Sequence, residues 1–251
     1  MEPVVPADGG FSGETVSLQD RSQLFDSWAG RYDASLSGGD GDFPFAGYER
    51  VLDEAVSLAN VQPGMRVLDL GIGTGNLAAR FLDRGCAIWG IDFSTEMLAK
   101  ARAKLPEAML VQADLLGEWP ATLSSVFDRV VSAYVLHEFP LEAKLALLSR
   151  LAANALAPEG AVVVADIAFP TALARAEAAR RLAPYWDDDE SYWAADETLA
   201  AGQDLGLQVT YTQVSFCGGV FVFRRGCASG VRAERKLLDP GQSGGKWSAD
   251  G

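Results

Sequence analysis

A short apolar run, a glycine-rich turn and the start of a helix follow one another at residues 67–77, and this stretch constrains the fold more than any other. Val67, Leu68 and Leu70 form an apolar run that is typical of a strand buried in a parallel sheet. Every second residue of the turn is a glycine, which removes Cβ atoms and lets a ligand lie against bare backbone. The glycines are Gly71, Gly73 and Gly75. The stretch therefore predicts a nucleotide-binding turn, the alternative being a glycine-rich turn without a ligand.

The spacing of the glycines distinguishes between kinds of nucleotide site. Dinucleotide sites carry Gly-x-Gly-x-x-Gly or Ala, whose third small residue lets helix and strand pack closely beside a pyrophosphate. Here Asn76 takes that third position and the turn contains no cationic residue, which argues against a dinucleotide site and against a P-loop. With Asp69 two residues before the first glycine, the pattern resembles motif I of class I S-adenosylmethionine (AdoMet) methyltransferases. That resemblance implies that the turn meets the methionine end of AdoMet, whose ammonium tolerates a nearby carboxylate.

Composition limits the partners of the chain. Its 251 residues, 49% of them hydrophobic, can bury one sizeable core, so one domain is expected. The 21 basic and 34 acidic residues give a net charge of −13, which opposes binding to nucleic acid and permits a small neutral or cationic substrate. Cys86, Cys217 and Cys227 show no paired spacing and indicate reduced thiols. Since no apolar stretch reaches the length of a membrane span and no signal-peptide pattern is present, a cytoplasmic protein without a membrane partner is expected.

Apolar periodicity alternates between strand and helix over most of the chain, which predicts an α/β fold. Strands are expected at about 66–70, 87–91, 108–112, 129–133, 161–165, 208–213 and 220–224. Helices are expected at about 20–36, 45–60, 76–84, 95–105, 141–156, 172–182 and 196–206. This alternation predicts a Rossmann-like, seven-stranded, mostly parallel sheet with helices on both faces. The short link before the last strand predicts that this strand is antiparallel.

The same pattern divides the chain into three parts. Residues 1–19 lack periodicity and are expected to be mobile. Residues 20–225 are expected to form a single class I methyltransferase domain, with a helical cap at 20–60 and a Rossmann-like core at 61–225. Residues 226–251 are small, polar and aperiodic, so a disordered tail is expected.

Two aromatic residues of the expected cap have two interpretations. Trp28 and Tyr32 belong to the apolar stripe of the first helix. They either pack in the core or lie over the carboxyl edge of the strands as part of the cofactor site. In the second position their rings would exclude water, which a methyl transfer requires.

Two acids that follow neighbouring strands are candidates for nucleoside contacts. Asp92 ends the second strand, where an acid accepts hydrogen bonds from ribose hydroxyls; the alternative is an acid favoured by the following helix N-terminus. Phe93 can lie against adenine. Asp114, beside the backbone N–H of Leu115, can read the adenine amino group and the neighbouring ring nitrogen; the alternative is an aspartate that closes an Asx turn.

Residues 132–139 leave the fourth strand toward the same edge, where strand-end residues line the crevice of open α/β sheets. Ser132 is expected beside the cofactor, and Tyr134 beside either AdoMet or the acceptor. His137 is the only histidine in the sequence, and no cysteine cluster is present, so no metal site is expected. With Tyr134 it is the catalytic candidate: it either accepts a proton from the substrate or hydrogen-bonds backbone to order the loop. Glu138 is interpreted as a helix-start carboxylate.

An unusual segment at residues 184–193 combines four consecutive acids with flanking aromatic residues. Runs of acids usually form solvated loops. Aromatic faces beside carboxylates also suit a cation. The segment is therefore either a solvated loop or part of an acceptor pocket.

The span from about Phe25 to Arg224 resembles the YrrT-like AdoMet-dependent methyltransferases of the class I superfamily. The resembling segments are Phe25-Asp26-Ser27-Trp28-Ala29 with Tyr32-Asp33, Phe45-Ala46-Gly47-Tyr48, the Gly71–Asn76 turn, Gly90-Ile91-Asp92, Ser132-Ala133-Tyr134 with His137, and Val164-Ala165-Asp166. By that resemblance Gly71, Asp92 and Asp114 would contact AdoMet. The chain departs from the family pattern at Asp92, where Glu is usual, and at Glu138, where a second histidine is usual.

Together these features predict an AdoMet-dependent methyltransferase that methylates a small-molecule acceptor and releases S-adenosylhomocysteine (SAH). AdoMet carries an activated methyl group, so such an enzyme mainly aligns the acceptor and excludes water. One alternative is a non-catalytic AdoMet sensor or partner subunit, which would keep the same cofactor site. An NAD-dependent oxidoreductase is disfavoured by Asn76, by Asp114 and by the lack of a recognisable second catalytic domain.

Overall fold

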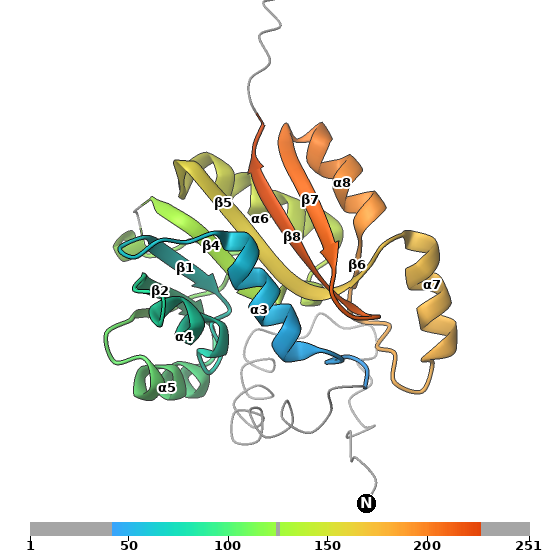
Figure 1. The fold of residues 1–251 in the computed structure, drawn as a ribbon, viewed down its shortest axis with the longest axis horizontal. Helices are drawn as coiled ribbons and strands as arrows, with labels where there is room; N and C mark the ends of the chain where they lie inside the picture. Colours follow the sequence, from blue (N-terminus) through green and yellow to red (C-terminus); the bar gives the residue numbers. More distant parts are fainter. Residues whose placement is uncertain (1–41, 124–125, 227–251) are drawn as a thin grey trace, which may run out of the picture.

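The computed structural model describes residues 42–123 and 126–226 of the chain (Figure 1). The strands of this part are β1 (Arg66–Leu70), β2 (Ala87–Asp92), β3 (Met109–Gln112), β4 (Phe127–Ala133), β5 (Leu156–Phe169), β6 (Trp193–Ala194), β7 (Leu207–Gln213) and β8 (Gly218–Arg225). Its α-helices are α3 (Tyr48–Ala59), α4 (Asn76–Leu82), α5 (Thr95–Lys104), α6 (Leu141–Asn154), α7 (Ala172–Arg181) and α8 (Ala195–Asp204). Two short 3₁₀-helices are η1 (Ala121–Leu123) and η2 (Leu136–Glu138).

The strands form one sheet in the order β3-β2-β1-β4-β5-β8-β7, and β6 pairs with β5 beside this path. Strands β1 to β5 run parallel, whereas β8 is antiparallel to both of its neighbours. The predicted mostly parallel sheet with an antiparallel last strand is therefore confirmed. The strand order changes direction between β1 and β4, which creates a crevice at the carboxyl ends of these strands.

Helices cover both faces of the sheet, as predicted (Figure 1). One buried core contains residues of α3 and α4, and the other contains residues of α6 and α8. Val67 of β1 belongs to the first core and the adjacent Leu68 to the second. Because successive side chains of a strand point to opposite faces, a strand covered on both faces needs an unbroken apolar run.

Besides small shifts at helix ends and the two 3₁₀-helices, the observed elements differ from the predicted ones in two strands. Strand β5 is longer than the predicted 161–165. The sequence Pro158-Glu159-Gly160 suggests a turn before residue 161, but β4 and β5 already pair at Leu156 and continue across an irregular register. Strand β6 was not predicted, because two residues are too few to show a periodicity.

Part of the predicted organisation lies outside the described residues. This applies to the segment 1–19, the helix at 20–36, and the tail from residue 227. The second helix of the expected cap is α3, which packs on β5 and β8. Among the helices of the described part, none combines the length and the apolar character that crossing a membrane requires.

The packing of α6 on the sheet leads to a first prediction. Leu148 of α6 is fully buried in the second core, so Leu148→Ala should lower the free energy of unfolding by about 2–5 kcal/mol. For a chain of this size, each kcal/mol corresponds to a fall of roughly 2–4 °C in Tm. The matched control is Leu173→Ala on α7, whose side chain is 73% exposed. Thermal unfolding should separate the two variants; equal Tm values would contradict this placement of α6.

Candidate cofactor and acceptor site

A cavity opens at the carboxyl ends of the parallel strands, inside the crevice between β1 and β4. Its walls come from the turn after β1, the last residue of β2, the segment after β3 and the segment after β4. The lining residues are Tyr48, Asp69, Gly71, Ile72, Gly73, Thr74, Asn76, Leu77, Asp92, Phe93, Met97, Asp114, Leu115, Ala133, Tyr134, Val135, Glu138 and Phe139. The cavity thus brings together residues from four separate regions of the sequence.

Most of the predicted site residues lie at this cavity. The lining set includes Asp69, Gly71, Gly73, Asn76, Asp92, Phe93, Asp114, Leu115 and Tyr134. Gly75, Ser132 and His137 are not among the lining residues. Trp28 and Tyr32 fall outside the described residues, so their two interpretations stay open.

The glycine turn presents bare backbone to the cavity at Gly73. Its φ is +54°, and a Cβ added there would meet no atom within 4 Å, so a side chain would occupy open cavity space. Gly71 has a φ of +66°, and an added Cβ would lie 2.6 Å from a methyl group of Val135. Gly75 precedes α4, and an added Cβ would meet Leu105 at 2.8 Å, so it faces protein rather than the cavity.

The carboxylate of Asp92 joins the glycine turn to the end of β2. Its Oδ2 accepts a hydrogen bond from the Gly73 N–H at 2.8 Å, and its Oδ1 accepts one from the Ser94 N–H at 2.9 Å. Each carboxylate oxygen has two lone pairs, so one hydrogen bond does not saturate it. Ser94 in turn caps α5 by accepting from the Met97 N–H. The fold therefore positions Asp92 from two sides.

Asp69 brings a second carboxyl group to the same wall. It is 2% exposed, and burial together with the charge of Asp92 raises its pKa well above the usual range. A hydrogen bond with the backbone at Ala78 acts in the opposite direction. A cationic ligand group beside this wall would restore the charged form, whereas an anionic one would not.

Asp114 combines the two roles that the sequence left open. Its Oδ1 accepts from the Leu116 N–H at 2.9 Å, the hydrogen bond of an Asx turn. Its side chain also lines the cavity with Leu115 and Phe93. The turn therefore fixes the carboxylate at the cavity edge, and the two interpretations are compatible.

The segment after β4 begins with a strained residue. Tyr134 has a φ of +55°, a left-handed conformation that is rare for a bulky side chain. Its ring packs against the rings of Tyr48 and Phe45, at centroid distances of 5.1 and 5.4 Å. Before it, the Ser132 hydroxyl donates to the Leu70 carbonyl at 2.9 Å and ties β4 to β1. Ser132 thus aligns the strands that flank the crevice.

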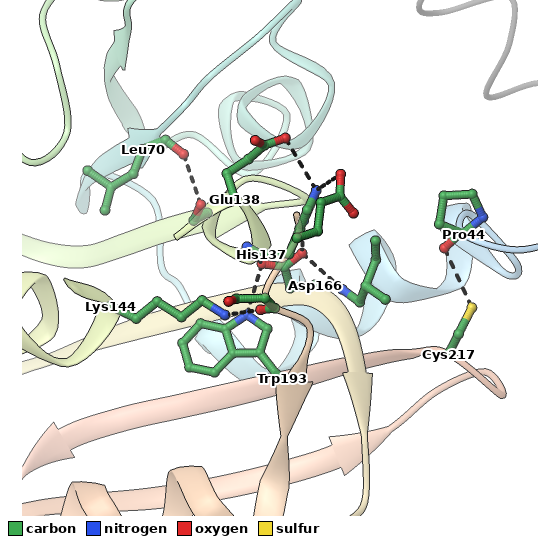
Figure 2. Close-up of polar contacts among 12 residues, drawn as sticks. Pro44, Leu70, His137, Glu138, Lys144, Asp166, Trp193 and Cys217 are labelled. Carbon is green, nitrogen blue, oxygen red and sulfur yellow. Dashed lines mark hydrogen bonds and ion pairs between the residues drawn. The ribbon is translucent and has the colours of Figure 1, made fainter. Parts of the chain in front are cut away.

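His137 is held by a buried aspartate, as Figure 2 shows. Its Nδ1 lies 2.6 Å from Oδ1 of Asp166, and its backbone N–H donates to Oδ2 at 2.9 Å. The Trp193 indole N–H donates to the same Oδ2 at 3.0 Å. The sequence indicated Asp166 only as the last residue of a segment, Val164-Ala165-Asp166, that resembles the family pattern. An acid inside the buried run of β5 was the signal that could have identified it.

Carboxylates determine the charge of His137. Burial alone would lower its pKa, but the charge and hydrogen bond of Asp166, with further help from Glu190 and Glu138, raise the pKa to about 9. The ring is therefore protonated at neutral pH. A role as proton acceptor, as predicted, would require pH values near or above this pKa, or loss of a neighbouring negative charge.

A second cavity lies beside His137 and Asp166, and residues of the acid-rich segment 184–193 form part of its lining. It is lined by Pro140, Leu141, Glu142, Lys144, Arg175, Trp186, Glu190, Ser191, Tyr192, Trp193, Ala194 and Glu197. Trp186 packs edge-on against Tyr192 and is stacked on Phe43, at centroid distances of 4.5 and 5.7 Å. Glu190 lies 3.7 Å from Nε2 of His137, while Asp187, Asp188 and Asp189 are exposed. The acidic segment thus has both a solvated part and a part at a cavity.

Known proteins share this architecture and much of the sequence. Residues 67–160 match a family model described as a methyltransferase domain. The chain is 35% identical over 200 residues to an uncharacterized methyltransferase of Geobacillus sp. (strain WCH70), an alignment that covers 76% of this chain and 91% of the relative. The chain belongs to this methyltransferase family. Another member, the uncharacterized methyltransferase YrrT of Halobacillus halophilus, is 27% identical over 201 residues, with 76% and 91% covered, which confirms the resemblance to YrrT-like proteins.

Solved structures of methyltransferases confirm the Rossmann-like fold of this family member. DhpI in complex with SAH matches with a TM-score of 0.64 at 19% identity, over 83% of this chain and 97% of that chain. The magnesium protoporphyrin IX methyltransferase of Synechocystis PCC 6803 with bound SAH matches with a TM-score of 0.61 at 20% identity, over 83% and 100%. Family and bound ligands agree that the cofactor is AdoMet. The [4+2]-cyclase SpnF matches equally well, with a TM-score of 0.62 at 16% identity over 84% and 98%, so fold alone does not set the reaction.

The environment of Asp69 leads to a second prediction. Because its pKa is raised in the folded state, its contribution to stability is present below the usual aspartate pKa and is lost as pH rises through the raised value. Asp69→Asn should therefore stabilise the ligand-free protein at neutral pH by about 1 kcal/mol or more, and should weaken AdoMet binding. Tm values across a pH series and calorimetric titration with AdoMet measure the two effects.

The matched control for this prediction is Asp188→Asn, a change of the same kind at an exposed position. It should leave both the pH profile of Tm and AdoMet binding unchanged. A loss of stability in Asp69→Asn at neutral pH would show that the negative charge of Asp69 stabilises the fold.

Proposed function

We propose that this protein transfers the methyl group of AdoMet to a small-molecule acceptor and releases SAH. The observation that carries the proposal is the meeting of Asp92, Asp114 and the bare backbone of Gly73 at one cavity. Carboxylates on neighbouring strand ends can bind two separate parts of one nucleoside, and an open glycine position lets the ligand approach the turn.

Each wall of the cavity suits a different part of AdoMet. Asp92, which lines the cavity at the end of β2, would accept hydrogen bonds from the ribose hydroxyls. Asp114 and the Leu115 N–H would read the adenine edge, and Phe93 would lie against the ring. The glycine turn and Asp69 would meet the methionine end, whose ammonium suits a buried carboxyl group.

The same features disfavour a dinucleotide. A pyrophosphate would place two negative charges beside Asp69 and Asp92, which already repel one another. Asn76 occupies the position where dinucleotide sites use a small residue. The acidic composition likewise favours a small acceptor over a nucleic acid, because phosphate binding needs clustered cations.

The acceptor side of the proposal involves Tyr134, His137 and the second cavity. Tyr134 and Glu138 line the cofactor cavity, Glu190 lines the second cavity, and His137 contacts both glutamates. When bound, AdoMet supplies a methyl group that is already activated, so these residues need only align the acceptor and exclude water. Asp166 holds Nδ1 of His137, so the opposite side of the ring, with Glu138 and Glu190, would face the acceptor.

Cofactor binding tests the nucleoside assignment and gives a third prediction. Asp92→Ala removes hydrogen bonds to a charged group, each worth about 1.5–3 kcal/mol, so SAH affinity should fall by roughly 10–100-fold or more. The matched control is Glu96→Ala, an exposed acid four residues further along the chain, which should bind SAH like the wild type. Calorimetric titration measures both. Equal affinities, or clear NADH binding by a protein that ignores AdoMet and SAH, would contradict the assignment.

Methyl transfer itself gives a fourth prediction. Incubation with AdoMet carrying a tritiated methyl group and panels of small amines, thiols and acids should label one chemical class well above the background of cofactor hydrolysis. SAH should accumulate in equal amount with the labelled product. A protein that binds AdoMet tightly but labels no class would instead be a non-catalytic sensor or partner subunit.

A further inference from the structure

Two carboxylates flank one ring nitrogen at the boundary of the two cavities, which gives three possible metal ligands. Nε2 of His137 lies 3.8 Å from a carboxylate oxygen of Glu138 and 3.7 Å from one of Glu190. The three donor atoms all lie within 4.8 Å of one another. His137 is 6% exposed, and among the described residues its Nε2 makes no hydrogen bond. This nitrogen therefore faces two carboxylates at distances longer than a hydrogen bond.

The spacing of these atoms suits a shared ion better than a shared proton. A hydrogen bond needs an N···O distance of about 2.7–3.2 Å, which neither glutamate reaches. Nitrogen and oxygen ligands bind Zn²⁺ at about 2.0–2.2 Å, so two ligands of one tetrahedral ion lie roughly 3.3–3.6 Å apart. The observed distances of 3.7 and 3.8 Å are close to this value. Small side-chain rotations would suffice to bring the donors onto one ion.

Residues behind the donors fix their orientation. Asp166 contacts Nδ1 of His137 and so directs Nε2 toward the glutamates (Figure 2). Asp166 is itself fixed by the N–H groups of His137, Ile167 and Trp193. The Tyr192 hydroxyl hydrogen-bonds Glu190. A carboxylate on the far nitrogen of a histidine is the usual outer partner of a metal-binding imidazole.

The partial exposure of the two glutamates and the charges around them also suit a bound cation. The side chains of Glu138 and Glu190 are 26% and 23% exposed, so an ion can reach the buried nitrogen from solvent. The nearby cation Lys144 interacts with the Ser191 carbonyl and the Trp193 ring. The sequence predicted no metal site because it has one histidine and no cysteine cluster. Carboxylates are also ligands for several divalent ions.

We propose that His137, Glu138 and Glu190 bind one divalent transition-metal ion, of the Zn²⁺ or Mn²⁺ kind, with Asp166 as the positioning residue. One imidazole and two carboxylates form a mixed nitrogen and oxygen donor set that suits these ions better than Mg²⁺, which prefers oxygen ligands and retains its waters. Three protein ligands leave coordination positions free for other molecules. This site goes beyond the proposed function and does not depend on the identity of the acceptor.

Metal titration is the test and gives the fifth prediction. Tag-free protein is treated with a chelator, dialysed, and titrated in a calorimeter with ZnCl₂, MnCl₂ and MgCl₂ separately. Zn²⁺ or Mn²⁺ should bind with a stoichiometry of one, and Mg²⁺ should bind at least tenfold more weakly. Electron paramagnetic resonance of added Mn²⁺ should show loss of the free-ion signal at the same stoichiometry. Failure of both Zn²⁺ and Mn²⁺ to bind saturably would overturn the proposal.

Variants assign the bound ion to these residues. Glu190→Gln should weaken binding at least 100-fold, because a ligand is lost. Asp166→Asn, which leaves all three ligands in place, should weaken it by roughly 10–100-fold through the orientation of His137. Asp188→Asn, an exposed change in the same segment, is the matched control and should bind the ion like the wild type. Equal metal affinity of Glu190→Gln and wild type would place the ion elsewhere and refute the site.

SAH titration of the same metal-free samples keeps the conclusions separate. Retained SAH binding by Glu190→Gln shows that the variant is folded, so its loss of metal binding is specific. SAH binding without metal binding in the wild type refutes the metal site alone, and metal binding without SAH binding refutes the cofactor assignment alone.

Discussion

The shared direction of five neighbouring strands determines where this protein can do chemistry. Because β3, β2, β1, β4 and β5 run parallel, the segments that follow them emerge at one edge of the sheet. The change of strand order between β1 and β4 then separates those segments and leaves a crevice. Asp92 stabilises this arrangement, since its two oxygens bond the turn after β1 and the start of α5. The position of the site thus follows from the topology, and the hydrogen bonds of Asp92 fix the local geometry of the turn.

Charge varies in a consistent way along this edge. Burial disfavours the negative charge of Asp69, and the carboxylates around His137 favour a positive charge there. At both places neighbouring carboxylates favour cations over anions: Asp92 acts on Asp69, and Asp166 acts on His137 with the two glutamates. AdoMet carries a sulfonium and an ammonium, whereas SAH lacks the sulfonium charge. Under the proposed function, an acidic edge would therefore attract the cofactor more strongly than its product, which favours exchange of one for the other.

The sequence identified many of the residues that line the first cavity, because they lie at or just after the ends of strands with clear periodicity. Asp92 and Asp114 could be placed at one edge once the strands before them were recognised. The acceptor side was harder. Glu190 lies in a segment without periodicity, far along the chain from His137, and tertiary contacts such as the pairing of β6 with β5 bring that segment to the sheet. Asp166 is hidden in an apolar strand, and its partner depends on strand register, which composition does not reveal.

The strained backbone of Tyr134 depends on contacts with α3 and the segment before it. A left-handed backbone in a bulky residue costs about 1–3 kcal/mol and persists only where surrounding contacts enforce it. Those contacts are the bond of its N–H to the Ala165 carbonyl and the rings of Tyr48 and Phe45, which belong to the helical side of the molecule. Displacement of α3 would therefore release conformational energy at the end of β4. Tyr48 is the first residue of α3, so the packing of this helix helps to hold the wall of the crevice in its strained conformation.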